Sequence, residues 1–148
     1  MTAAGASRAV WRPAVSATLA TSGYIHAQLY IDGYRFIHDI GTLFLLQAGV
    51  SFAAAALLLV GAPIGLRCAA AGIALGALGG FAASRTTGIL GFTERGLQPA
   101  PQALISVLAE VATLLLLLPP LIRALRNQAR DRAVRARLTA VLAQEPTD

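Results

Sequence analysis

A long apolar segment at residues 40–61 constrains this chain more than any other feature. It contains GTLFLLQAGVSFAAAALLLV and has no charged residue. About 20 predominantly apolar residues are needed for a helix to cross the roughly 30 Å hydrocarbon core of a bilayer. A soluble domain of this size buries only about two-thirds of the surface that its unfolded chain exposes, so it could not hide several such segments. The segment is therefore predicted to span a membrane.

Three further apolar segments, at 13–31, 66–84 and 102–125, also approach the length of a span. Across the chain 56% of the residues are hydrophobic and only 13% are charged, about half the charged share of an ordinary soluble domain. We expect an all-α integral membrane protein, a four-helix bundle with an N-terminal tail at 1–12 and a basic helical tail at 126–148. Pro119 and Pro120 are expected to bend or end the fourth span.

The first apolar segment is the weakest of the four, because serine, threonine, histidine and glutamine interrupt it. A cleaved signal peptide is the alternative to a retained helix. A signal peptide needs a compact apolar core followed by a small-residue cleavage site. Here the segment leads directly into tyrosine-rich sequence, which favours a retained helix.

The arginines predict the orientation of the bundle. All twelve basic residues are arginines, and the formal net charge is +5. If both termini are cytoplasmic, nine arginines lie inside (8, 12, 67, 123, 126, 130, 132, 135 and 137) and three outside (35, 85 and 95). This bias predicts a multi-pass membrane protein with both termini in the cytoplasm. The basic tail directly follows an apolar segment, so we expect a solvated helix whose charges orient the protein in the lipid bilayer. The alternative is that it binds anionic lipid head groups, and nucleic acid is not expected as a partner.

Glu110 is predicted to lie inside the fourth span, roughly 12 Å from its outer end at about 1.5 Å per residue. A charged side chain at such a depth is costly, so an ionisable residue there indicates a functional site or a partner of opposite charge. Arg85 and His26 are predicted at a similar depth. A structural pair between Glu110 and Arg85 is the simplest interpretation, and His26 continues a polar stripe that should face the bundle interior.

His38 and Asp39 precede the second segment and complete the candidate polar site. Two histidines could ligate one haem, or bind a metal together with Asp39 or Glu110. The spacing matches no established metal or haem motif, so no metal site and no cofactor are predicted, with a haem or a quinone kept as alternatives. The single cysteine, Cys68, excludes an intrachain disulfide and is expected to be a small buried apolar residue.

Gly72, Gly76 and Gly80 recur every fourth residue and therefore share one stripe of the third segment. Small residues let helices in a membrane approach closely. The stripe is predicted to pack against another helix of this bundle, or alternatively against a second subunit. The loop at 86–101 is expected to lie on the membrane or to fold over the mouth of the bundle, with Glu94 and Arg95 in solvent.

Three stretches carry a resemblance to known proteins: GYIHAQLYIDGYRFIHDIGTLFLL, GIALGALGGFAASRTTGILGFTE and LAEVATLLLLL, within residues 23–118. The chain resembles small four-span actinobacterial membrane proteins of unknown function. This resemblance implies that His26, the glycine-rich third span and Glu110 are recurrent positions. The four-span layout is also loosely similar to the DoxX family, some of whose members partner redox enzymes, so a redox role is implied only by analogy of layout.

No nucleotide-binding loop, nucleophile elbow or metalloprotease motif occurs in the sequence. The leading functional expectation is a non-enzymatic accessory or interaction subunit, with a membrane partner or a second copy of the chain. The alternative is a redox or small-molecule site near the outer leaflet, for a quinone, a haem or a proton, built from His26, Arg85 and Glu110.

Overall fold

A computed structural model describes the backbone of residues 3–142 and the side chains of residues 10–137 and 139. In this part of the chain there are four α-helices, α1 (Ala3–Asp32), α2 (Ile40–Val60), α3 (Ile64–Arg85) and α4 (Gln102–Leu142), and a short 3-10 helix, η1 (Tyr34–Phe36). The fold is therefore all-α. Helix α1 extends back into the predicted tail at 1–12, and residues 143–148 of the predicted C-terminal tail lie outside the described part.

Among the described residues, three helices are long and apolar enough to cross a membrane: α2, α3 and the part of α4 from Gln102 to Arg137. Their mean hydropathies are 2.3, 1.6 and 2.2. Helix α1 is long enough but is not among them, since hydroxyl and amide side chains dilute its apolar surface. These properties support a membrane protein, and the role of α1 as a fourth span stays a prediction.

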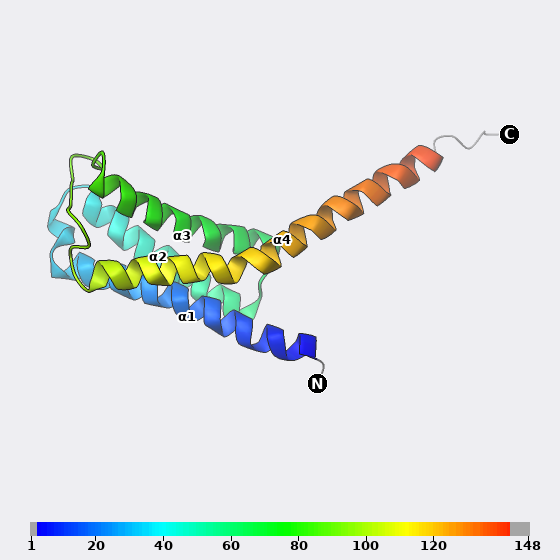
Figure 1. Ribbon diagram of the computed structural model, residues 1–148, viewed down its shortest axis with the longest axis horizontal. Coiled ribbons are helices and arrows are strands. Elements are labelled where there is room, and N and C mark those ends of the chain that lie inside the picture. The colour runs from blue at the N-terminus through cyan, green and yellow to red at the C-terminus, as the bar shows by residue number, and fades with distance from the viewer. Residues whose placement is uncertain (1–2, 143–148) are drawn as a thin grey trace.

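The four helices run side by side in an elongated bundle (Figure 1). The described ends of α1 and α4 lie at one end of the bundle, and the connections through η1 and through residues 86–101 lie at the other. Val15, Leu19, Leu58 and Leu117 form the centre of the core. Many large apolar side chains remain on the outside, as expected where the surrounding medium is lipid.

A close contact between α1 and α2 occurs at Gly23, a glycine outside the periodic stripe. A Cβ atom at Gly23 would lie 3.2 Å from the Cβ of Ser51, so Gly23 lets α1 approach α2. A Cβ at Gly72, Gly76 or Gly80 would meet nothing within 4 Å. The prediction that this stripe packs against another helix of the bundle is wrong, because the glycines face open space. A contact with a second subunit stays a prediction.

Helix α4 continues through Pro119 and Pro120 and changes direction in this region (Figure 1). Pro120 has no N–H, so the carbonyl of Leu116 lacks its usual donor one turn later. The indole Nε1 of Trp11 donates to this carbonyl at 2.7 Å. Arg67 donates to the Pro120 carbonyl at 3.4 Å and lies over the Trp11 ring. Side chains from α1 and α3 thus hold the bend, and the arginines from 123 to 137 continue beyond it on an exposed helix.

Candidate functional site

A cavity of about 410 Å³ lies among the four helices, at the end of the bundle that carries η1 and the 86–101 loop. Its volume falls within the usual range for small-molecule pockets, about 300–1,000 Å³. His26, Arg85 and Glu110 all line it, although they come from α1, α3 and α4. Most of the remaining lining is apolar. The structure therefore brings together the three residues that the sequence places at similar depth.

Glu110 has two hydroxyl partners and no arginine. Its carboxylate is buried, with the residue only 2% exposed. The Oε1 atom accepts hydrogen bonds from Ser106 at 2.9 Å and from Ser22 at 3.1 Å. The predicted pair between Glu110 and Arg85 is wrong, because the loop after α3 supplies a different carboxylate to Arg85. Ser22 reaches Glu110 because α1 and α4 pack directly against each other.

His26 lies one turn after Ser22 on α1. Its Nδ1 atom lies 2.9 Å from the Ser22 carbonyl oxygen. A carbonyl can only accept, so Nδ1 carries the hydrogen and the Nε2 of the neutral ring is left as an acceptor. The polar stripe of α1 does face the bundle interior, as expected: Ser22 is buried, and Thr18 accepts a hydrogen bond from Thr113 on α4 at 2.7 Å.

Arg85 ties the 86–101 loop to the end of α3. Its guanidinium Nη2 lies 2.9 Å from the Glu94 carboxylate, and both side chains are mostly buried, 13% and 16% exposed. The remaining N–H groups donate to the Ser84 hydroxyl and to backbone oxygens of Phe81, Gly96 and Gln98. All five guanidinium hydrogens thus have acceptors. The loop and the end of α3 together use every donor of Arg85, so none is left for a ligand.

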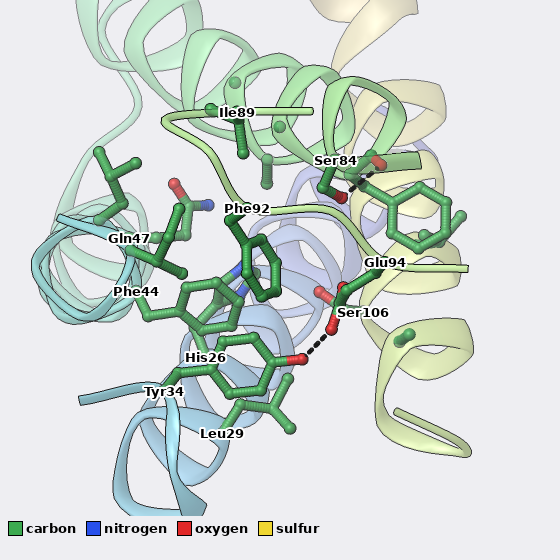
Figure 2. A pocket seen from close by; sticks show the side chains of 18 of the residues that line it. His26, Leu29, Tyr34, Phe44, Gln47, Ser84, Ile89, Phe92, Glu94 and Ser106 are labelled. Carbon is green, nitrogen blue, oxygen red and sulfur yellow. Dashed lines mark hydrogen bonds between the residues drawn. The ribbon is translucent and has the colours of Figure 1, made fainter. Parts of the chain in front are cut away.

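Tyr34, in η1 between α1 and α2, closes the same end of the cavity as Arg85 and the 86–101 loop. Its hydroxyl donates to Glu94, and its ring stacks on Phe44 with centroids 4.4 Å apart. Phe92 packs edge-on against Tyr34. Figure 2 shows these three rings gathered beside His26. Burial and the hydrogen bond to Glu94 raise the pKa of the Tyr34 hydroxyl, so it remains a donor at neutral pH.

We call Tyr34, Arg85, Phe92 and Glu94 together the cap. The expectation that the 86–101 loop folds over the bundle mouth agrees with this arrangement. The expectation that Glu94 is solvated is wrong, since its carboxylate joins η1 to α3. Sequence reasoning missed Tyr34 and Glu94 as site residues. The available signal was weak: an acidic residue in an apolar, glycine-rich loop, and an arginine at the end of a span that needs a counter-charge.

His38 and Asp39 lie outside the cavity. They contact each other at 3.5 Å, and the His38 side chain is 98% exposed. Asp39 occupies the N-cap position of α2 but makes no capping hydrogen bond with its side chain. Only one of the two histidines can therefore face a ligand in the cavity. Within residues 3–142 no three His, Cys, Asp or Glu side chains come close enough together to hold a metal ion.

The glycine stripe contributes to the site by leaving space. Gly76 and Gly80 line the cavity, whereas Gly72 does not. Across the cavity, Gln47 on α2 donates from Nε2 to the Ile73 carbonyl at 3.3 Å and to Ser51 at 3.4 Å. Cys68 is exposed on α3, so the expectation that it is buried is wrong. The arrangement is a largely apolar chamber with polar atoms on its walls, which is suited to binding and orienting a small molecule.

Comparisons of the chain with protein-family models, with curated proteins and with solved structures found no match. The resemblance to small four-span actinobacterial proteins and to the DoxX layout therefore stays a prediction. The functional conclusions below depend on the geometry of the cavity and the chemistry of its walls.

Proposed function

We propose that this chain binds a small amphipathic molecule in the cavity beside His26 and Glu110. One observation carries the proposal: a ligand-sized, mostly apolar cavity contains polar atoms that no described residue engages. Nε2 of His26 and Oε2 of Glu110 have no hydrogen-bond partner in the described part of the chain, and neither atom is fully buried there. Leaving such atoms without hydrogen bonds costs free energy in an apolar environment. A ligand with a polar group that hydrogen-bonds to them would therefore be stabilised in the cavity.

We propose further that the protein crosses the bacterial plasma membrane four times, with both termini in the cytoplasm. The excess of arginines at the end opposite the cavity supports this orientation. It places the cavity near the outer leaflet. In a Cys68→Ser background, Thr93→Cys should react with a membrane-impermeant maleimide added to intact cells. Labelling that occurs only after lysis would contradict the orientation.

The binding proposal is tested on protein extracted directly from membranes into lipid–polymer discs. Mass spectrometry of the small molecules that co-purify should find a compound at about one copy per chain. Gly76→Leu adds a branched side chain to the cavity wall, at a position where a Cβ meets nothing within 4 Å, and it should abolish co-purification. Gly72→Leu is the matched control, because it adds the same side chain to the same helix outside the cavity. Equal recovery from wild type and Gly76→Leu would refute the proposal.

The reduced quinol form of a quinone would satisfy this chemistry, because its hydroxyl groups can donate to Nε2 of His26. A haem held by two histidines would not, because His38 lies outside the cavity. A second candidate function is the accessory or interaction subunit expected from the sequence. It is favoured by the exposure of Gly72 and Gly76, which leaves α3 without a close helical neighbour along this stripe. Crosslinking in native membranes tests it, and a chain that crosslinks to no protein would count against it.

A further inference from the structure

The lining residues that are exposed point to an opening of the cavity on the flank between α2 and α3. Leu43 and Leu46 line the cavity from α2, yet they are 40% and 58% exposed. Gly76 lines the cavity from α3 and is exposed as well. Both helices are apolar enough to lie in a bilayer at this flank. The opening therefore faces lipid in the proposed membrane arrangement, whereas the cap covers the end of the bundle.

Two of the unused polar atoms of the cavity are hydrogen-bond acceptors. Nδ1 of His26 donates to a carbonyl, so Nε2 of the neutral ring accepts. The Nε2 group of Gln47 is directed to the Ile73 carbonyl, so its Oε1 is also free to accept. The third unused atom is Oε2 of Glu110, since Ser22 and Ser106 both donate to the Oε1 atom of that side chain. In the described part of the chain every fully buried side-chain polar atom has a partner, so these three atoms are accessible.

Among the described residues that line the cavity, none offers a free positive charge to an anion. Arg85 is the arginine on its wall, and its charge is balanced by Glu94 while its five N–H groups are already bonded. A phosphate or carboxylate head group would meet the acceptors of His26 and Gln47 in place of donors. This chemistry disfavours an acidic lipid as the ligand.

We infer that the ligand is an uncharged, lipid-soluble alcohol or phenol that enters from the bilayer between α2 and α3. Its hydroxyl donates to the acceptors on the cavity wall, from His26 and Gln47 above all, and its apolar part lies along Gly76 and Gly80. The inference rests on the proposed binding function and specifies the chemical class of its ligand. Binding of such a ligand requires no conformational change of the protein, because the opening and the acceptors are already in place.

The test uses two probes, para-octylphenol and its methyl ether, para-octylanisole. They differ in one substituent, because a methyl group on the ether replaces the hydroxyl hydrogen of the phenol. The full-length protein in nanodiscs is incubated with tritiated para-octylphenol, and each unlabelled compound competes for it. The Gly76→Leu protein in identical discs measures partition into lipid. The phenol should bind about tenfold more tightly than the ether, because the ether leaves the acceptors unpaired.

Variants locate the preference. His26→Phe keeps an aromatic ring but removes the acceptor Nε2, and Gln47→Leu removes the acceptor Oε1. Each variant should bring the ratio of phenol affinity to ether affinity toward one. His38→Phe is the matched control and should leave the ratio unchanged, because His38 lies outside the cavity. If either cavity variant fails to fold, the other still decides the outcome.

Each outcome bears on a different claim. Equal binding of phenol and ether by the wild type, or tighter binding of the ether, overturns this inference and leaves the binding proposal standing. Absence of saturable binding by both compounds, together with no co-purifying molecule, overturns both. A preference that survives in His26→Phe and in Gln47→Leu also overturns the inference, because the hydroxyl would then be recognised elsewhere.

Discussion

Arg85 lies 2.9 Å from Glu94, not beside Glu110, and this pair determines how the cavity is closed. The pair joins the last turn of α3 to the loop that follows it. Tyr34 adds a hydrogen bond to the same carboxylate from η1. Two connections that are far apart in sequence are thereby held together over the end of the bundle, while Glu110 is left to the cavity.

Removing the charge of Glu94 should loosen the cap. Glu94→Gln leaves the mostly buried guanidinium of Arg85 without its counter-charge, and we expect a loss of about 1–3 kcal/mol in the free energy of unfolding. Thermal unfolding in nanodiscs measures this loss. Arg95→Gln is the control, since Arg95 is exposed and has no such partner among the described residues. Equal stability of the two variants would show that the cap is not held by this pair.

The cap should respond to alkaline pH through Tyr34. Its pKa is raised above the ordinary value of 10.0, mainly by burial and then by the Glu94 hydrogen bond. The stabilisation is therefore fully present below about pH 10 and is lost as the pH rises through the higher folded-state pKa. Of the steps in tyrosinate absorbance, the one at the highest pH should be absent from Tyr34→Phe and retained by Tyr24→Phe. The same high-pH step in wild type and Tyr34→Phe would contradict this assignment.

Trp11 and Pro120 should be energetically coupled. Trp11→Phe keeps an aromatic ring beside Arg67 but leaves the Leu116 carbonyl without a donor, at a cost of about 1–2 kcal/mol. Pro120→Ala restores a backbone N–H that can bond the same carbonyl. Trp11→Phe should therefore cost less in the Pro120→Ala background. A double-mutant cycle of unfolding free energies measures the coupling, and strict additivity would argue against this role for the indole.

Gly41 should tolerate no side chain, unlike a glycine farther along the same helix. A Cβ at Gly41 would lie 2.9 Å from the Cα of Arg35 and from the backbone oxygen of Tyr34. Gly41→Ala should cost about 1–3 kcal/mol and displace η1 from the cap. Gly49→Ala is the matched control, because a Cβ there meets nothing within 4 Å; it should be neutral or slightly stabilising. Similar unfolding temperatures for both variants would contradict this contact.

Much of the fold could be predicted because its signals are local. The apolar segment at 40–61 matches α2 to within one residue at its C-terminal end. The predicted third segment at 66–84 lies within α3, which begins two residues earlier and ends one residue later. The continuation of α4 past Pro119 was open, because it depends on donors from Trp11 and Arg67 that only the tertiary structure supplies.

The site was predicted in part, since depth along a helix can be counted from the sequence but partners cannot. His26, Arg85 and Glu110 do line one cavity. The choice of Glu94 as the partner of Arg85 depends on the path of a loop. The glycine stripe could not be interpreted either, because periodicity locates a face of a helix without saying whether a helix, a ligand or lipid lies against it.

The most direct test of the cavity as a binding site is nitrogen-15 NMR of the two histidine side chains in nanodiscs. His26 lines the cavity and His38 does not, so the protein contains its own control. Saturation with para-octylphenol should move the Nε2 signal of His26 upfield, as that atom accepts a hydrogen bond, and leave both signals of His38 in place. His38→Gln assigns the signals. An unchanged His26 at saturating probe, or a shift confined to His38, would contradict the account.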